Sequence, residues 1–150
     1  MKKIIFTLIF LFNISISFGQ INSNLILNKY SRAEGASSLK INNLCCAIAK
    51  PFCKELRDLK VKSIKILDLS DCNKEIKEDF NNTIRNNFDI NKDIVLMYIN
   101  DDNENVILLT NERKNKIVLL VTGEDPVLIN VKAKVTKESI AKIMNYQNNN

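Results

Sequence analysis

The sequence contains no histidine and no tryptophan, and it has only three glycines and two prolines among 150 residues. Without histidine, the chain has no Ser-His or Cys-His pair for nucleophilic catalysis. It also lacks the tryptophan platforms on which many glycosidases hold sugars, and the glycine-rich loops that cradle phosphates. These absences favour a protein without catalytic residues and without a cofactor.

The first residues have the three parts of a secretory signal peptide. Lys2 and Lys3 form a positively charged start, and Ile4–Phe12 is almost wholly apolar. Ser17–Gly19 then places small residues before a cleavage site. A membrane-spanning helix would need about 20 consecutive apolar residues, and polar residues interrupt this run too early. We therefore expect cleavage after Gly19 and no stable membrane anchor.

Cleavage would divide the chain into a signal peptide (residues 1–19), one α+β domain (residues 20–146) and a polar tail (residues 147–150). We expect the mature protein to be exported, and to be periplasmic or secreted. Without Lys2 and Lys3 the formal charge of +5 falls to +3, and no run of basic residues remains. This modest, scattered charge predicts no nucleic-acid partner.

The first part of the mature chain alternates between helical and extended patterns. A short amphipathic helix should begin at Ser23 and stop near Gly35. A strand should follow at Ser37–Ile41, and Asn42 should cap a second helix. Pro51 either kinks that helix or opens a third one. The apolar residues expected to pack are Leu25, Ile26 and Tyr30, then Leu44, Cys45 and Ile48, then Phe52, Leu56 and Leu59.

A strand and a long helix are predicted next. The strand is Ser63–Leu69, and Ser70 or Asp71 should cap the helix that follows it. This helix has the clearest helical pattern in the chain. Its apolar stripe is formed by Ile76, Phe80, Ile84 and Phe88.

The second half contains four runs rich in β-branched residues, separated by short polar turns. The runs are Ile94–Ile99, Val106–Thr110, Ile117–Val121 and Val127–Val131. Short turns favour consecutive hairpins, and Thr136 should cap a last helix. The predicted fold class is α+β, with an antiparallel β-meander in the C-terminal half and helices packed on one face. The pattern does not determine the order of the strands.

Two stretches of this half, Ile94–Ile99 and Lys116–Val121, are apolar at nearly every position. Such strands suit central positions that are covered on both sides, and we favour this interpretation. If helices cover one face alone, the other face would expose an apolar patch that invites a partner.

Three stretches of the chain share the pattern of a known family. The first is LNKYSRAEGASSLKI, and the second is LRDLKVKSIKILDLSD. The third is NKIVLLVTGEDPVLINVKAKVTKESIAKI, which contains two strands, an acidic turn and a closing helix. With a signal peptide ending in SFGQ, the chain resembles the exported Bacteroidota family called domain of unknown function 4252.

The chain departs from this family pattern in two respects. Ala133 stands where a glycine is expected at the end of the last strand, and the four cysteines are not typical of the family. The resemblance implies a small envelope protein with no assigned activity, and it carries over no functional residues.

The cysteines Cys45, Cys46, Cys53 and Cys72 are even in number, in a chain that we expect to enter an oxidising compartment. On one continuous helix, Cys46 and Cys53 would lie about 10 Å apart, too far to bridge. A kink at Pro51 would shorten that distance, and Cys72 could instead meet Cys53 or Cys45. A disulfide of undetermined pairing and buried reduced thiols are both open interpretations.

The sequence shows no convincing metal site. The cysteine spacing lacks the C-x2-C knuckle of zinc sites, and Asp89–Asp93 matches an EF-hand loop only until Ile94 replaces the required glycine. We interpret this segment and the acidic Asp101–Glu104 as polar turns. Ser37 and Lys40 match an S-x-x-K motif, but a strand would place them on opposite faces.

The leading hypothesis is a non-enzymatic interaction module of the cell envelope that binds another protein or a surface component. It rests on the export signal, the missing catalytic residues and the apolar strands. The alternative is a small-ligand binder or an enzyme that uses a carboxylate or cysteine site. Size alone suggests a third hypothesis, an inhibitor or immunity-type protein. The sequence leaves the oligomeric state undetermined.

Overall fold

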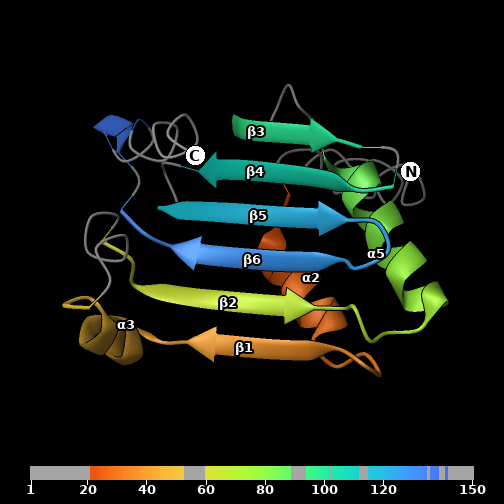
Figure 1. Cartoon of the computed structure of the whole chain (residues 1–150), viewed down its shortest axis with the longest axis horizontal. Helices are drawn as coiled ribbons and strands as arrows, with labels where there is room; N and C mark the ends of the chain where they lie inside the picture. Colours follow the sequence, from red (N-terminus) through yellow and green to blue (C-terminus); the bar gives the residue numbers. More distant parts are fainter. Residues whose placement is uncertain are drawn as a thin grey trace, which may run out of the picture.

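The computed structural model describes residues 21–52, 60–88, 94–101, 103–111, 115–134, 136–138 and 141 (Figure 1). The helices in these ranges are α2 (Ser23–Tyr30), α3 (Asn43–Ala49) and α5 (Lys74–Asn87). The strands are β1 (Ser37–Ile41), β2 (Ser63–Asp68), β3 (Ile94–Asn100), β4 (Asn105–Asn111), β5 (Lys116–Thr122) and β6 (Val127–Lys132). Within these described ranges, no helix is both long enough and apolar enough to cross a membrane.

The six strands form one antiparallel sheet in the order β1-β2-β6-β5-β4-β3 (Figure 1). Strands β3 to β6 follow one another as hairpins, which confirms the predicted meander and the α+β class. Strand β2 joins this meander by pairing with β6, from Ser63 opposite Lys132 to Asp68 opposite Val127. The strand order could not be predicted, because this pairing joins segments from opposite halves of the chain.

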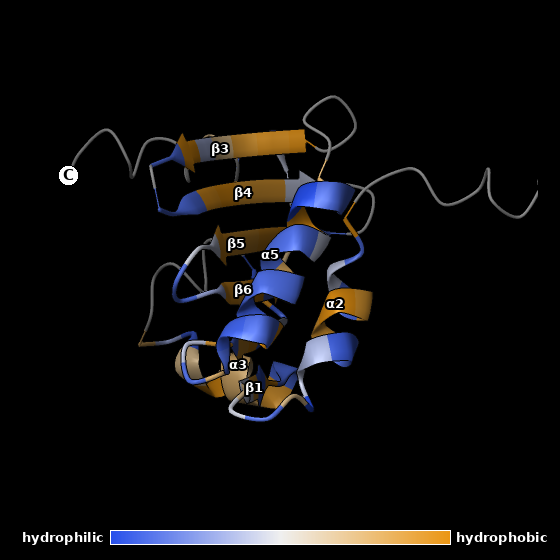
Figure 2. Ribbon diagram, turned by 90° about the vertical axis from the view of Figure 1, so that its right-hand side faces the viewer, coloured by the Kyte–Doolittle hydropathy of each residue, from blue (hydrophilic) through white to orange (hydrophobic). Residues whose placement is uncertain are grey.

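Helices α2 and α5 lie against one face of the sheet, here called the helix face (Figure 2). The sheet register aligns Leu67, Leu128 and Leu120 across three central strands, and all three are fully buried. Phe80 and Ile84 of α5 belong to the same core and are also buried. The predicted stripe of α5 is therefore confirmed, since Ile76 and Phe88 pack against this core as well.

Helix α2 is confirmed in position, but its apolar residues are divided between core and solvent. Ile26, Leu27 and Tyr30 are buried, whereas Leu25 is 65% exposed. Positions 26, 27 and 30 share one side of a helix, and position 25 points away from it. The sequence pattern included Leu25 because a short helix offers too few turns to define its buried side.

Helix α3 begins after Asn42 as predicted, but the residues expected to pack are wrong. Leu44 is 69% exposed and Ile48 is 64% exposed, whereas Cys46 is buried. Cys46 packs against Val61 and Ala133 in a small second core. Helix α3 is therefore rotated relative to the expected orientation, because this corner of the sheet accepts a small side chain.

Asparagine side chains cap all three described helices. Asn22 Oδ1 accepts from the backbone N–H of Leu25, and Asn42 Oδ1 accepts from that of Cys45. For α5 the cap is Asn73, whose Oδ1 lies 2.9 Å from the backbone nitrogen of Ile76. The prediction that Ser70 or Asp71 caps α5 is therefore wrong.

The displaced cap has a local cause. Ser70 donates its backbone N–H and its hydroxyl to the Asp68 carboxylate, at 2.9 and 2.6 Å. The backbone N–H of Cys72 donates to the carbonyl of Leu69. These bonds form a turn after β2, so the helix starts only at Asn73.

Helix α5 is also fixed to the turn between β5 and β6. Asn81 Nδ2 donates to the carbonyl of Gly123 at 2.9 Å, and Gly123 donates its N–H to Asn81 Oδ1 at 3.1 Å. Gly123 has a φ of 132°, and a Cβ at this position would clash with the carbonyl oxygen of Asn103. Glycine is therefore required where the α5 amide meets the turn.

Several predicted features lie outside the described residues. They are the signal peptide at residues 1–19, Cys53, most of the helix expected after Pro51, most of the helix expected after Thr136, and the tail at residues 147–150.

The cap assignment makes the first testable prediction. Asn73→Ala should lower the free energy of unfolding by about 1 kcal/mol, because a backbone N–H of α5 loses its acceptor. Asp71→Ala should change it by less than about 0.5 kcal/mol, as expected for a surface site. Urea denaturation followed by circular dichroism measures both. A larger effect at Asp71 than at Asn73 would contradict the observed cap.

Candidate functional site

The face of the sheet opposite the helix face, here called the second face, carries apolar side chains on every strand. Cross-strand partners point to the same face, so the register aligns one row across the sheet. We call it the apolar row, and it consists of Leu39, Ile66, Ile129, Leu119, Leu108 and Met97. Leu39 at the sheet edge is 55% exposed, and the other five are partly buried.

A β-bulge in the edge strand β3 brings Met97 into this row. The register shifts between Val95 and Met97, so Leu96 is an extra residue in β3. Val95 therefore packs against the core of the helix face, while Met97 lies opposite Leu108 on the second face. Without the bulge, residues 95 and 97 would point to the same face.

Two further rows flank the apolar row on the second face. One consists of Ile41, Ile64, Val131, Ile117, Thr110 and Ile94, and the other of Ser37, Asp68, Val127, Val121, Val106 and Ile99. The only polar members of the three rows are Ser37, Asp68 and Thr110. Asp68 is the only charged residue in these rows, and hydrogen bonds from Ser70 lower the pKa of its carboxyl and keep it ionised. The second face is therefore a nearly uncharged surface.

The described helices cover little of the second face. At one corner, α3 packs through Cys46 onto Val61 and Ala133, with Ile41, Ile64 and Val131 beside them. Helices α2 and α5 both lie on the helix face (Figure 2). The described helices therefore do not form the two-sided core that the sequence favours, and the apolar row lies beyond them.

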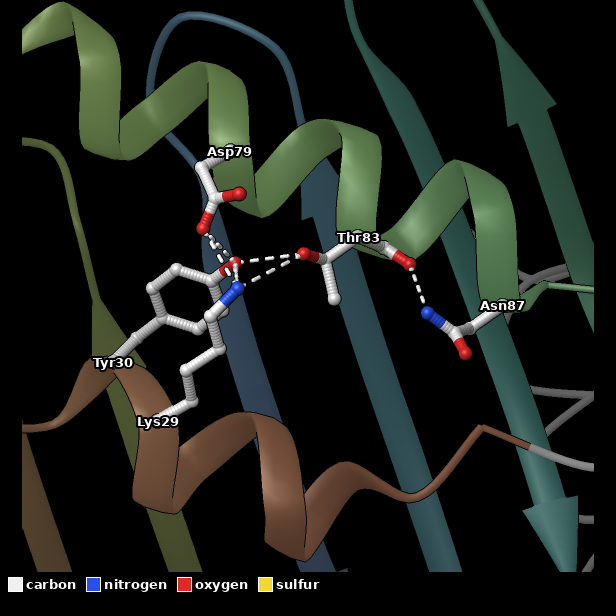
Figure 3. Close-up of polar contacts among 5 residues, drawn as sticks. All are labelled: Lys29, Tyr30, Asp79, Thr83 and Asn87. Carbon is white, nitrogen blue, oxygen red and sulfur yellow. Dashed lines mark hydrogen bonds and ion pairs between the residues drawn. The ribbon is translucent and has the colours of Figure 1, made fainter. Parts of the chain in front are cut away.

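A polar cluster joins the two helices on the helix face (Figure 3). Tyr30 donates its hydroxyl to Asp79 Oδ2 at 2.7 Å, and its oxygen lies 2.8 Å from Thr83 Oγ1. Lys29 Nζ lies 2.7 Å from Asp79 Oδ2 and 2.9 Å from the Tyr30 hydroxyl. The ring of Tyr30 meets Phe80 edge to face, with centroids 5.3 Å apart.

A lysine beside a tyrosine hydroxyl is a combination that could serve acid–base chemistry, but this cluster lacks a reacting site. The Tyr30 side chain is 3% exposed, and its hydroxyl is already bonded to three side chains. Lys29 is not a reactive base either. Hydrogen bonds to Asp79 and Tyr30 raise the pKa of its ammonium group, which keeps it protonated. We interpret the cluster as a clamp that holds α2 against α5.

A cleft of about 460 Å³ bears on the hypothesis of a cysteine or carboxylate site. It is lined by Cys72, Lys74, Lys77, Glu78, Gly123, Glu124 and Asp125. Lys74 pairs with Glu78 at 3.6 Å, and Lys77 pairs with Asp125 at 3.7 Å. Burial raises the pKa of the Cys72 thiol, which disfavours the reactive thiolate. These residues do not form a nucleophilic site.

The sequence left a disulfide and reduced thiols as open interpretations, and the described cysteines do not form a disulfide with one another. Cys45, Cys46 and Cys72 are free thiols, and Cys46 and Cys72 belong to separate hydrophobic cores. Pairing with Cys53 stays a prediction, because that residue lies outside the described ranges. Among the residues that the structure places, no group of three or more potential ligands could hold a metal ion.

The remaining motifs have structural explanations. Asp101 and Glu104 exchange backbone hydrogen bonds in the β3–β4 turn, so the acidic segment is a hairpin turn. Ser37 lies on the second face and Lys40 on the helix face, which confirms that the S-x-x-K match is accidental. The segment Asp89–Asp93 lies outside the described residues.

One group of residues was missed at the level of sequence. Lys65, Lys116 and Lys132 meet at one end of the helix face, next to Asn130 and the start of α2. The sequence feature that could have revealed this group is one lysine on each of β2, β5 and β6, at a position that faces the helices. It could not be recognised, because both faces of these strands are apolar elsewhere and the pairing of β2 with β6 was unknown.

The clamp predicts a pH dependence of stability. Hydrogen bonds from Lys29 and Tyr30 lower the pKa of the Asp79 carboxyl. Because this pKa lies below its unfolded value, the stabilisation is present above about pH 4 and is lost as the pH falls through the folded pKa. The Asp79 side chain is 57% exposed, so solvent screening limits the effect to about 0.5–1 kcal/mol.

Urea denaturation at pH 7 and at pH 3 tests this prediction. Asp79→Asn should lose less stability between the two pH values than the wild-type chain does. Asp68 also has a lowered pKa, so Asp79→Asn should keep part of the dependence. Equal losses in the wild-type and variant chains would contradict the clamp.

The thiols make a second prediction. Cys45 is exposed, and Cys46 and Cys72 are buried. Iodoacetamide should therefore alkylate Cys45 in the native state at least about tenfold faster than Cys46 or Cys72. Peptide mass spectrometry gives the rate for each residue. A disulfide between Cys46 and Cys72 in unreduced, unfolded protein would refute the arrangement.

Comparisons with known proteins place the chain in a family without assigning an activity. Curated proteins contain no significant match to the chain, and neither do solved structures. Residues 30–143 match the sequence profile described as Domain of unknown function (DUF4252). This match covers the last residue of α2, helices α3 and α5, and all six strands. The chain therefore belongs to the DUF4252 family.

Proposed function

We propose that the protein is a non-enzymatic interaction module of the cell envelope, and that it docks a different protein on its second face. The observation that carries the proposal is the apolar row, with one large apolar side chain on each of six adjacent strands. Monomeric soluble proteins rarely expose contiguous apolar patches larger than a few hundred Å². Covering such a surface with a partner removes apolar area from water and is favourable.

The size of the second face indicates the kind of complex. Neighbouring strands lie about 4.8 Å apart and residues rise by about 3.3 Å, so three rows on six strands span roughly 600 Å² at most. Helix α3 packs over the corner that contains Ile41, Ile64 and Val131, which reduces the area that a partner can reach. Two such surfaces would bury about 1,200 Å² in total, the lower limit of specific interfaces. Permanent homodimers bury about 2,000 Å² or more. This comparison supports a separate partner that binds reversibly.

The composition of the second face indicates the chemistry of that partner. Asp68 is the only charged residue in the three rows, and its carboxylate is already bonded to Ser70. A partner would therefore present a flat apolar surface, such as a sheet face, with few charges at its centre. The signal-peptide pattern of Lys2 to Gly19 supports an envelope location.

Two exposed leucines provide a matched test. Leu39 belongs to the apolar row and is 55% exposed, whereas Leu25 lies on α2 and is 65% exposed. Leu39→Glu should weaken partner binding by about 10- to 30-fold, since it removes roughly 1.5–2 kcal/mol of apolar contact. Leu25→Glu should leave the affinity within about twofold. Both side chains are exposed, so neither variant should disturb the fold.

The partner is identified first by photo-crosslinking in the native host, with benzoylphenylalanine at Leu108 and, as a control, at Leu25. The crosslinked protein is then purified, and its affinity for each leucine variant is measured by calorimetry. Crosslinks from Leu108 to the same chain or to a second copy would contradict the proposal. Equal weakening by Leu39→Glu and Leu25→Glu would contradict it as well.

A further inference from the structure

A cavity of about 330 Å³ lies on the helix face, next to the first turn of α2. It is lined by Asn24, Ser63, Lys65, Lys116, Asn130 and Lys132. These residues come from α2, β2, β5 and β6. Among the described residues that line it, three are lysines and none is an aspartate or a glutamate.

The sheet register concentrates positive charge at this end of the helix face. Lys40 lies directly opposite Lys65, and Lys116 lies directly opposite Lys132. Such partners have Cβ atoms about 5 Å apart, and like charges at these positions destabilise a sheet. Within the described residues, no ion pair joins Lys40, Lys65 or Lys132 to a carboxylate. The described residues therefore leave the repulsion between Lys40 and Lys65 uncompensated.

Asn130 holds the wall of the cavity in place. Its side chain is 5% exposed, and its Nδ2 donates to Ser23 Oγ and to Asn24 Oδ1, each at 3.1 Å. Because Asn24 Oδ1 accepts this bond, the group that Asn24 keeps for a further interaction is its NH₂ donor. The first turn of α2 contains no acidic residue, so the N-terminus of this helix adds a positive partial charge.

We propose that this cavity binds the phosphate group of a small molecule. The ammonium groups of Lys65 and Lys132 would carry most of the binding, and Asn24 and Ser63 would donate hydrogen bonds to the remaining oxygens. Every charge among the described lining residues is positive, which disfavours a cation and favours a doubly charged oxyanion.

The dimensions narrow the class of ligand. A volume of about 330 Å³ lies at the small end of the range for small-molecule sites, about 300–1,000 Å³. This volume suits free phosphate or a phosphate monoester. The lysines gather around one cavity, whereas a nucleic-acid backbone is followed by a stripe of basic residues. The cavity lies on the opposite side of the sheet from the second face, so the inference does not depend on the proposed docking surface.

Calorimetry on the mature chain tests the proposal with three probes at one ionic strength. They are inorganic phosphate, glycerol 3-phosphate, and phosphatidylcholine vesicles with or without phosphatidic acid. The Lys65→Gln/Lys132→Gln double variant should bind at least about tenfold more weakly than the wild-type chain. Lys62→Gln is the matched control, because it removes the same charge from an exposed residue one position before the cavity.

A second readout separates binding from folding. In the absence of anion, Lys65→Gln should raise Tm by about 2–4 °C, because it removes the repulsion with Lys40. Lys62→Gln should leave Tm unchanged. Binding that is lost in the double variant and kept in Lys62→Gln supports the proposal, and the probe that responds shows whether the phosphate is free, esterified or on a lipid headgroup. If none of the three probes binds, or if all variants bind a probe equally well, the proposal of a phosphate site is overturned.

Discussion

The dry layer between the sheet and its two helices is the interaction on which the rest of the structure depends. The strands contribute Leu67, Leu128 and Leu120 to this layer. Phe80 and Ile84 of α5 pack in the same core. Burying side chains of this size contributes about 1.5–3 kcal/mol each. No disulfide is formed among the described cysteines, so packing in this layer is the main force that holds α2 and α5 against the strands.

The same layer explains why the two proposed sites are different in kind. Along one row of the helix face, Leu109 and Val118 are buried apolar residues, and the polar residues Asn130 and Lys65 follow them. The polar cavity lies where the dry layer ends. The second face keeps its apolar character across all six strands. A protein on one side of the sheet and an anion on the other could therefore bind at the same time.

Much of the fold could be predicted from the sequence, because local patterns decided it. The stripe of α5 and the four C-terminal strands were found from spacing and short turns alone. The cap of α5 was wrong because Asp68 engages Ser70, a contact that spacing does not reveal. The orientation of α3 was wrong because a seven-residue helix has no pattern long enough to define a buried side.

The candidate sites were harder to predict than the fold. The apolar face was foreseen as an alternative, since its strands are apolar at successive positions. Lys65 and Lys132 lie on strands from opposite halves of the chain, and only the register between β2 and β6 places them together. Sequence alone offers no means to find such a pair.

The pairing of β2 with β6 also determines when the chain can fold during its synthesis. Strand β2 ends at Asp68, but its partner is complete only at Lys132. Leu67 cannot be buried against Leu128 before that partner has been made, and long-range pairing of this kind forms slowly. The growing chain therefore cannot complete its six-stranded sheet until Lys132 has emerged. Translocation machinery that threads unfolded polypeptides would meet little resistance from a nascent chain with this topology.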